Sequence, residues 1–258
     1  MAEKNLAQAI VATLLDQRDR RIERGFYWEN QIAFVYNSEK MEGSPLTKEQ
    51  TRTIFETGTI TGRSVNIDSV LETKNHFSMF DYMLDTLHSP LTKELIKKYH
   101  CILKTGTKED LEYDDIAVGG WKLIPNAVGG LETTPPSRVE EDMDKLLQSY
   151  AERAKTGYKE IAEFHVWFET IHPFQDGNGR VGRALMFREC VVNGLEPFIV
   201  LDEQKETYYQ GLSVFNKNPE KLIDFFKAMS DLYLIAYTNL IPEHLLLPRE
   251  KEFEDLNI

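Results

Sequence analysis

The segment in which groups able to do chemistry lie closest together spans residues 172–183 and reads HPFQDGNGRVGR. A histidine titrates near neutral pH, so His172 is a candidate general base for removing a proton from a hydroxyl. Asp176 is a carboxylate in an otherwise cationic loop, and one carboxylate beside phosphates is a common arrangement for holding Mg²⁺. Arg180 and Arg183 are spaced to lie on the same side of a helix and can each bind phosphate through two hydrogen bonds. The segment therefore predicts transfer of a phosphate-linked group to a hydroxyl.

The elements on either side of this segment must present it to a ligand. Apolar residues recur at helical spacing over residues 158–170, and a second amphipathic pattern predicts a helix over residues 178–192. Between them, Gly177, Asn178 and Gly179 are typical of a turn. A helix N-terminus presents unpaired N–H groups, and glycines allow a ligand to approach the backbone. We therefore expect a phosphate-binding nest at the start of the second helix.

Helical periodicity dominates the rest of the chain, and no internal repeat or long linker is visible. Capping residues are expected at Thr47 with Gln50, at Asp68 or Ser69, at Thr92, and at Ser137 with Glu140. The predicted helices cover about residues 2–24, 28–41, 47–58, 68–87, 92–106, 139–154, 158–170, 178–192, 205–216 and 219–240. Residues 118–130, VGGWKLIPNAVGG, lack a helical period and predict a hairpin or an extended flap.

These elements predict a mainly α fold: a single helical domain with a small β-hairpin flap. We expect N-terminal helices over residues 1–60, a catalytic core over residues 61–240 and a short tail over residues 241–258. The long amphipathic helices could supply the face of a homodimer.

The composition narrows the range of partners. The 258-residue chain has 42 acidic and 30 basic residues and a net charge of −12, which disfavours general binding to nucleic acid or to an anionic membrane. Its two cysteines form no CxxC pair and no zinc-type cluster with histidine. No signal peptide and no apolar stretch of membrane-spanning length is visible, so we expect a soluble, cytoplasmic protein.

The segment at residues 172–183 resembles the Fic family, whose motif HPFx(D/E)GN(G/K)RxxR it matches at every defined position. Members are helical proteins that usually transfer AMP from ATP to a Ser, Thr or Tyr hydroxyl of a target protein, which can be the enzyme itself. The resemblance implies that His172 is the general base and that Asp176 holds Mg²⁺. It further implies roles in nucleotide binding: Gly177, Asn178 and Gly179 at the α- and β-phosphates, Arg180 at the phosphates, and Arg183 at the γ-phosphate.

Two further stretches fit the same family. Residues 119–130 with Pro135 and Pro136 resemble the flap that binds the target segment by strand-like backbone pairing. Asn126 stands where members often carry an apolar clamp, so Leu123, Ile124 or Val128 would replace it. Downstream, Tyr208 with Tyr209, and Asn216, resemble the stretch that borders the adenine.

The stretch Ser38 to Gly43, SEKMEG, fits the family's inhibitory motif (S/T)xxxE(G/N), so the resemblance implies an inhibitory helix over about residues 30–43. Ser38 and Glu42 are four residues apart and so share one helix face. The resemblance implies that Glu42 pairs with Arg183, takes the place of the γ-phosphate, and leaves bound ATP misaligned.

Four alternatives remain open at this point. The chain could phosphorylate its target, as Doc-like members do, although these carry lysine where Gly179 stands. It could remove AMP from a protein, with Glu42 orienting water, or transfer a different group such as UMP or phosphocholine. A regulator that binds nucleotide without catalysis is the hypothesis from another class, and an intact His172 argues against it.

Overall fold

The computed structural model describes residues 6–60, 62, 65–114 and 116–246 of the chain. The first residues of the predicted N-terminal helix and most of the predicted tail lie outside this range. Over the described residues, no helix is both long enough and apolar enough to cross a membrane.

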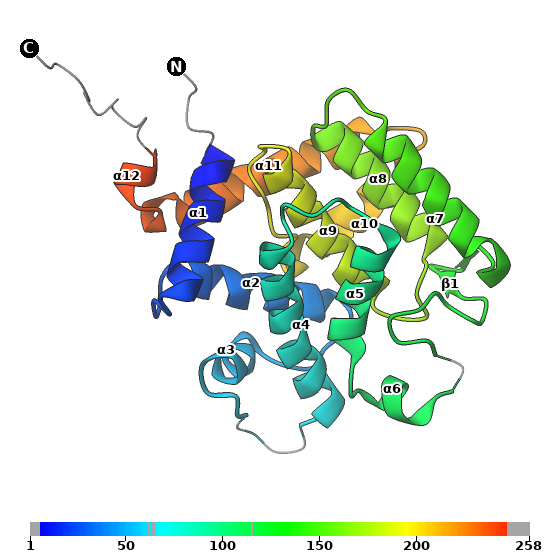
Figure 1. Cartoon of the computed structure of the whole chain (residues 1–258), viewed down its shortest axis with the longest axis horizontal. Helices are drawn as coiled ribbons and strands as arrows, with labels where there is room; N and C mark the ends of the chain where they lie inside the picture. Colours follow the sequence, from blue (N-terminus) through cyan, green and yellow to red (C-terminus); the bar gives the residue numbers. More distant parts are fainter. Residues whose placement is uncertain (1–5, 61, 63–64, 115, 247–258) are drawn as a thin grey trace, which may run out of the picture.

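The described part of the chain is built almost entirely from helices, which confirms the predicted fold class (Figure 1). The longer helices are α1 (Leu6–Asp19), α2 (Phe26–Met41), α3 (Lys48–Thr57), α4 (Ile67–Asp85), α5 (Lys93–Lys104), α7 (Pro136–Ala151), α8 (Tyr158–Ile171), α9 (Asn178–Val192), α10 (Lys205–Val214) and α11 (Glu220–Tyr237). Shorter helical pieces are α6 (Lys108–Glu112), α12 (Glu243–Leu246), η1 (Asp202–Gln204) and η2 (Thr238–Leu240). The strands β1 (Ala127–Val128) and β2 (Leu131–Glu132) form the predicted hairpin, with Ala127 opposite Glu132.

Helix α9 lies in the middle of the molecule, where α1, α2, α4, α5 and α8 surround it (Figure 1). Almost all of its residues are buried, including polar ones near its N-terminus. A helix enclosed in this way cannot shift without disturbing several neighbours. Its N-terminus is therefore a fixed platform for the turn that precedes it.

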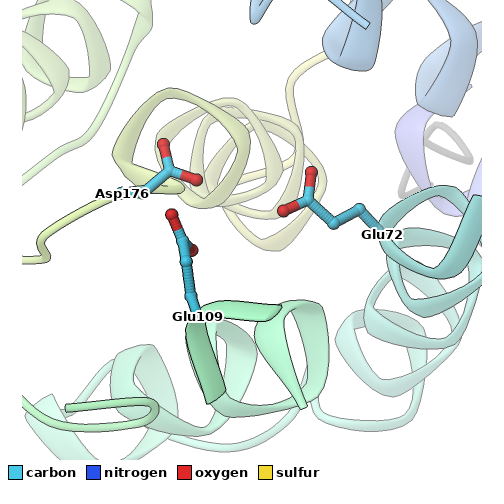
Figure 2. Close-up of side chains that lie close together, drawn as sticks. All are labelled: Glu72, Glu109 and Asp176. Atoms are coloured by element: carbon cyan, nitrogen blue, oxygen red, sulfur yellow. The ribbon is translucent and has the colours of Figure 1, made fainter. Parts of the chain in front are cut away.

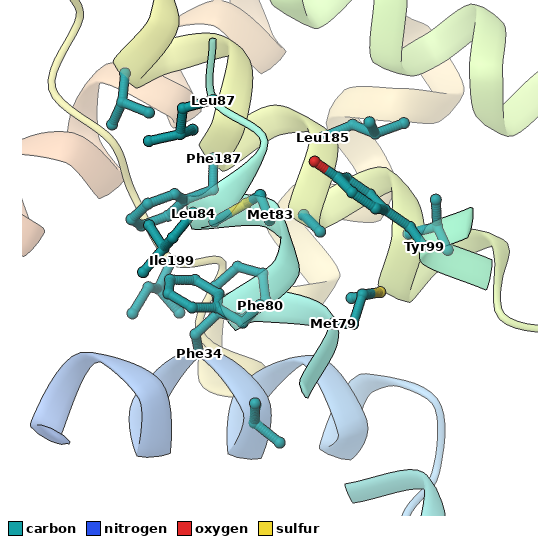
Figure 3. Close-up of a cluster of buried hydrophobic side chains, with 14 of the residues drawn as sticks. Phe34, Met79, Phe80, Met83, Leu84, Leu87, Tyr99, Leu185, Phe187 and Ile199 are labelled. Carbon is teal, nitrogen blue, oxygen red and sulfur yellow. The ribbon is translucent and has the colours of Figure 1, made fainter. Parts of the chain in front are cut away.

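An aromatic cluster holds α2 and α4 against α9 (Figure 3). The rings of Phe34 and Phe80 have centroids 4.9 Å apart, and the ring of Phe187 lies 5.8 Å from the first and 5.2 Å from the second. All three are fully buried or nearly so. Phe34 is one helical turn before Ser38, so this packing also fixes the end of α2 that carries the predicted inhibitory motif.

Most helix boundaries agree with the sequence, and the exceptions have local causes. The capping box at Thr47 and the cap at Thr92 are confirmed. Helix α4 is capped by Asn66, whose side chain accepts from the N–H groups of Asp68 and Ser69. The expected cap at Asp68 or Ser69 is therefore wrong. The amide of Asn66 serves because it comes one residue before the first helical position.

Two other helix ends differ from expectation. The capping box at Ser137 is wrong, because α7 already begins at Pro136, whose fixed φ and missing N–H suit the first helical position. Helix α1 ends at Asp19 rather than near Arg24, and both Arg21 and Arg24 have positive φ values, 53° and 56°. The connection to α2 is thus a tight turn instead of a helical continuation.

Candidate active site

The turn between α8 and α9 is rigid and carries the groups singled out in the sequence. His172 ends α8 in a left-handed conformation, with φ 51° and ψ 61°. Asn178 closes the turn with its amide, which accepts from the N–H of Phe174 and donates to the C=O of the same residue, both at 2.8 Å. Phe174 itself is fully buried. The turn is therefore held by its own hydrogen bonds and by an apolar anchor.

His172 lies at one end of this turn and is kept neutral by its surroundings. Burial, and then the positive charge of Lys122, lower the pKa of His172 to about 4. Its Nδ1 atom lies 3.7 Å from Oε2 of Glu169, one turn earlier on α8. The imidazole is therefore in the unprotonated form that a general base needs at neutral pH, while its lowered pKa also makes it a weaker base than an ordinary histidine.

Asp176 lies at the other side of the turn within a network of charges. Its Oδ2 atom bonds Nζ of Lys104 at 2.6 Å and Nη2 of Arg180 at 2.7 Å. Burial opposes ionisation, but the nearby charges of Arg180 and Lys104 outweigh it and hold the pKa of Asp176 well below its usual value. The carboxylate is thus ionised and, at 42% side-chain exposure, accessible to a cation.

Two further carboxylates, both missed by sequence reasoning, approach Asp176 from other helices (Figure 2). Glu72 comes from α4 and Glu109 from α6, and one oxygen of each of the three residues lies within 4.8 Å of the others. The ammonium of Lys104 contacts all three, at 2.5 Å from Glu72 and 2.6 Å from Asp176. Oxygen donors of this kind are what Mg²⁺ prefers, so the donor set fits the ion implied by the resemblance, although Lys104 already neutralises part of its charge.

Arg180 is more deeply embedded than its predicted role suggests. Its guanidinium is buried and bonds Glu72 at 2.6 Å and Asp176 at 2.7 Å, with Glu39 of α2 at 3.3 Å. Glu39 in turn lies 2.8 Å from Nδ1 of His76. A phosphate role for Arg180 stays a prediction, and in this structure its side chain ties the turn to α2 and α4.

Arg183 is held by the two residues that the SEKMEG motif singled out. Its Nη2 donates to Oε1 of Glu42 at 2.6 Å and to the C=O of Ser38 at 2.9 Å, while its Nε donates to Oγ of Ser38 at 2.8 Å. The guanidinium is 4% exposed. Gly43, with φ 86°, follows Glu42 as α2 ends.

Glu42 also lies directly against the start of α9. A Cβ atom placed on Gly179 would overlap Oε1 of Glu42 and would crowd the guanidinium of Arg183. The absence of a side chain at Gly179 is therefore what lets a carboxylate reach this helix N-terminus, where an anion is favoured. A phosphate needs the same approach.

The flap lies against the turn through backbone and side-chain hydrogen bonds. The N–H of Lys122 donates to the C=O of Pro173 at 2.8 Å, and the amide of Asn126 donates to the C=O of Phe174 at 3.0 Å. Asn126 thus joins the flap to the turn, a role that its position in the motif did not indicate. The predicted target-binding residues Leu123 (58%), Ile124 (40%) and Val128 (46%) are exposed at the flap surface, and the N–H of Ile124 donates to Oε1 of Gln175 in the turn at 3.4 Å.

The predicted adenine-binding residues differ in their surroundings. Tyr208 is buried and its hydroxyl lies 2.5 Å from Nε2 of His165, which makes it a core residue. Tyr209 is 41% exposed, and its hydroxyl lies 3.5 Å from the C=O of Met41 at the end of α2. Asn216 follows α10 and is exposed, and within the described residues no hydrogen bond or ion pair joins it to the turn. Contact with a nucleotide base stays a prediction for Tyr209 and Asn216.

His100 of α5 supports the turn and carried no motif by which the sequence could reveal it. Its ring stacks on Phe174, with centroids 3.9 Å apart and planes 6° apart. Nδ1 accepts from the N–H of Gly119 at 3.0 Å, so Nε2 carries the proton and donates to the C=O of Asp176 at 3.1 Å. Burial, and then the charge of Lys104, lower the pKa of His100 to about 3. The neutral His100 side chain therefore joins α5 to the flap and to the turn through its two ring nitrogens.

Buried neutral histidines should make the fold sensitive to acid. Burial is the largest cause of a lowered pKa at His76, at His100 (about 3), at His165 (about 3) and at His172 (about 4). The unfolded chain binds these protons near pH 6.5, whereas the folded chain binds them only at lower pH, so stability falls as pH drops below 6.5. Burial raises the pKa of Glu169 to about 8, so near neutral pH the folded chain holds one proton there that the unfolded chain has released. This single group opposes the loss of stability that the histidines cause on acidification.

We expect the urea midpoint of unfolding to decrease from pH 7.5 to pH 5, and each buried histidine to contribute up to about 1.4 kcal/mol per pH unit. Unfolding curves at fixed ionic strength measure this directly. A midpoint that is unchanged or higher at pH 5 would contradict the assignment of these histidines as neutral.

Comparison with known proteins places this site in a family. Residues 90–190, which contain α5, the flap, α7, α8, the turn and most of α9, match the sequence profile described as the Fic/DOC family. These residues form a Fic domain. The match ends at Cys190, within α9, so it covers His172, the glycine-rich turn and Arg183, whereas α2 with Ser38 and Glu42 lies outside it.

Several known proteins are similar over more of the chain than the Fic domain alone. Proteins named protein adenylyltransferase Fic, from Drosophila willistoni and from Drosophila melanogaster, are each 26% identical to it over 91% of its length. The chain spans about half the length of these curated relatives, 47% in both cases.

Solved structures share the fold. A Fic domain containing signaling protein from Bacteroides thetaiotaomicron superposes with a TM-score of 0.73 and 21% identity, over 97% of this chain and 100% of the other. Fic-1 from C. elegans gives a TM-score of 0.69 and 20% identity, over 91% of this chain and 72% of the other. The helical arrangement around the Fic domain is thus shared well beyond residues 90–190.

Proposed function

We propose that this chain is a protein adenylyltransferase, which transfers AMP from ATP to a Ser, Thr or Tyr hydroxyl of a target protein, and that Glu42 inhibits it. The observation that carries the proposal is the turn between α8 and α9. It joins a neutral imidazole at His172 to a helix N-terminus with an anion site over Gly179, which is flanked by Arg183 and holds the carboxylate of Glu42 in this structure. The Drosophila relatives named protein adenylyltransferase Fic support the same activity.

In this reaction each part of the site has one task. The N–H groups at the start of α9 bind the phosphates, and Arg183 binds the γ-phosphate once Glu42 has left it. Nε2 of His172 takes the proton from the target hydroxyl as its oxygen attacks the α-phosphorus. The new O–P bond forms as the bond to the β-phosphate oxygen breaks, and pyrophosphate leaves.

Asp176 would hold Mg²⁺ at the phosphates, with Glu72 and Glu109 near enough to orient its water ligands. When bound, the ion would neutralise charge on the phosphates and on the leaving pyrophosphate. The flap would align the target by backbone pairing along its exposed residues. The target is a protein and can be a second copy of this chain.

We also propose that two parts of the chain have different roles, one regulatory and one catalytic. Residues 1–60 would serve as the regulatory part, because α2 brings both Ser38 and Glu42 to the guanidinium of Arg183. Residues 61–240 would form the catalytic part, with its flap at residues 118–130.

The activity is tested by incubating the Glu42→Gly variant with a cell lysate, Mg²⁺ and ATP labelled at the α-phosphate. We expect label on protein and a mass increase equal to AMP on a hydroxyl side chain. Label from the γ-phosphate, or a mass equal to phosphate, UMP or phosphocholine, would contradict the proposal and indicate one of the other transfer reactions. Binding of ATP without any transfer would indicate a nucleotide-binding regulator.

The metal assignment is tested by Asp176→Asn, which keeps the size of the side chain and removes its charge. We expect Mg²⁺-dependent transfer to fall by about 10²-fold or more, because the ion supplies several kcal/mol of charge stabilisation. Binding of Mn²⁺, followed by electron paramagnetic resonance, should weaken in parallel. Glu112→Gln, on the same helix as Glu109 but at the surface, is the control. Equal Mn²⁺ affinity in wild type and Asp176→Asn would show that another residue holds the metal.

A further inference from the structure

Lys122 of the flap is buried in an unusual environment for a lysine. Only 2% of the residue is exposed, and over the described part of the chain no carboxylate forms an ion pair with it. Its ammonium donates instead to neutral oxygens: Oδ1 of Asn126 at 2.7 Å, Oγ1 of Thr133 at 2.5 Å and the C=O of Ile171 at 3.2 Å. Burial lowers the pKa of Lys122 to about 8. Burying an ammonium without a carboxylate partner costs free energy, so its hydrogen bonds must serve to hold the segments that it joins.

Lys122 contacts the residues on either side of His172, the proposed general base. Its backbone N–H bonds the C=O of Pro173 at 2.8 Å, and its ammonium bonds the C=O of Ile171. These two carbonyls belong to the residues immediately before and after His172. One residue of the flap therefore bonds the carbonyl of the residue before His172 and the carbonyl of the residue after it.

His172 needs such support because its backbone is strained. A non-glycine residue with φ 51° lies in the left-handed region, which is unfavourable and persists only where surrounding contacts impose it. The N–H of His172 bonds the C=O of Phe168 within α8, but that bond fixes only one side of the residue. The bonds from Lys122 fix the carbonyls on both sides.

We propose that Lys122 is a positioning residue for His172. By bonding the carbonyls on both sides of His172, it keeps the imidazole in its left-handed turn and docks the flap against it. Its positive charge also disfavours protonation of the ring. The catalytic consequence rests on the proposed function, whereas the structural consequence can be measured without it.

Several other charged groups face the imidazole and must be considered with Lys122. Glu169 lies one turn earlier on α8, Glu42 at the end of α2, and Asp176 across the turn. A hydrogen bond to the backbone of Glu169 and the charges of Glu42 and Asp176 raise the pKa of His172, and burial together with Lys122 opposes them. Removing the charge of Lys122 should therefore raise the pKa of His172 towards its ordinary value.

The test uses Lys122→Met and Lys122→Arg, each in the Glu42→Gly chain so that transfer can be measured. Lys98→Met, at an exposed position of α5, is the matched control. We expect Lys122→Met to lower kcat by about 10²-fold, the loss expected for a base displaced by about 1 Å. The acidic limb of the pH profile should move to higher pH, and Lys122→Arg should restore part of both. Lys98→Met should change neither.

NMR of the histidine rings gives a readout that does not depend on transfer. In Lys122→Met, the ring of His172 should titrate at higher pH than in wild type, and its backbone ¹³C shifts should move away from left-handed values. If these signals are unchanged and only KM for the target rises, Lys122 serves the flap alone and the proposal is wrong. If no chain transfers AMP but the signals move, the proposed function fails and the positioning role stands.

A milder variant covers the case in which Lys122→Met does not fold. Thr133→Val removes one of the three oxygens that accept from the ammonium and leaves the charge in place. We expect the His172 signals to shift in the same direction but by less, with the flap amides exchanging faster. Unchanged His172 signals together with faster flap exchange would overturn the proposal.

Discussion

His172→Ala is expected to lower AMP transfer by about 10²–10⁴-fold while leaving ATP affinity nearly unchanged. The imidazole is neutral because burial, and then Lys122, lower the pKa of His172 to about 4, so it is ready to accept a proton at neutral pH. The proposed phosphate-binding groups lie at the start of α9, several residues away. Loss of the base should therefore affect kcat and spare binding.

The backbone of His172 makes a second variant necessary. Alanine is less suited than asparagine to a φ of 51°, so His172→Ala could also relax the turn. His172→Asn tolerates the left-handed conformation and still lacks a base of suitable pKa. Both variants should lose transfer to the same extent, measured with α-labelled ATP in the Glu42→Gly chain, and calorimetry should give ATP affinities within a fewfold of the parent. A parallel loss of ATP affinity in His172→Asn would assign His172 a structural role.

The parts of the site that were predicted from the sequence are those whose geometry is local. The His172–Arg183 segment specifies its own turn, since Asn178 closes it onto Phe174 and α9 begins where the glycines end. The pairing of Glu42 with Arg183 joins distant segments, and only the resemblance indicated it. Periodicity predicted most of the helices because those with a polar outer side bury one apolar face.

The parts that sequence reasoning missed depend on contacts between distant segments. Lys104, Glu72 and His100 reach the turn from α4 and α5, and each is an ordinary polar residue in an amphipathic helix until the helices are packed. Asn126 was expected at a clamp position, but it is an internal hydrogen-bonding residue because the Phe174 carbonyl lies within its reach. No spacing rule within one segment encodes such a distance.

Glu42→Gly is expected to raise transfer by roughly 10–100-fold over wild type. The hydrogen bond from Arg183 to Glu42 is a charge-assisted contact of 2.6 Å to a guanidinium that is 4% exposed. Such contacts contribute about 1.5–3 kcal/mol, and every 1.4 kcal/mol is tenfold in an equilibrium. Removing the carboxylate frees the α9 N-terminus and the guanidinium for the γ-phosphate.

The size of the carboxylate can be separated from its charge with Glu42→Gln. Glutamine still fills the space over Gly179 but no longer neutralises Arg183, so activation should be intermediate. Glu49→Gln, at an exposed position on α3, controls for the loss of one negative charge from an acidic protein and should leave the rate at the wild-type level. Full activation by Glu42→Gln would show that charge alone sets the inhibition.

Arg183→Ala distinguishes competition for one guanidinium from simple loosening of α2. This variant also breaks the contact with Glu42, and it further frees Ser38, so α2 should be at least as loose as in Glu42→Gly. It also removes the proposed ligand of the γ-phosphate, so it should not be activated. Wild type, Glu42→Gly and Arg183→Ala are compared by protein-bound label from α-labelled ATP with a verified target present.

Activation of both variants would mean that the docking of α2, rather than occupation of the phosphate position, restrains the enzyme. Equal labelling of wild type and Glu42→Gly would remove Glu42 from the mechanism altogether.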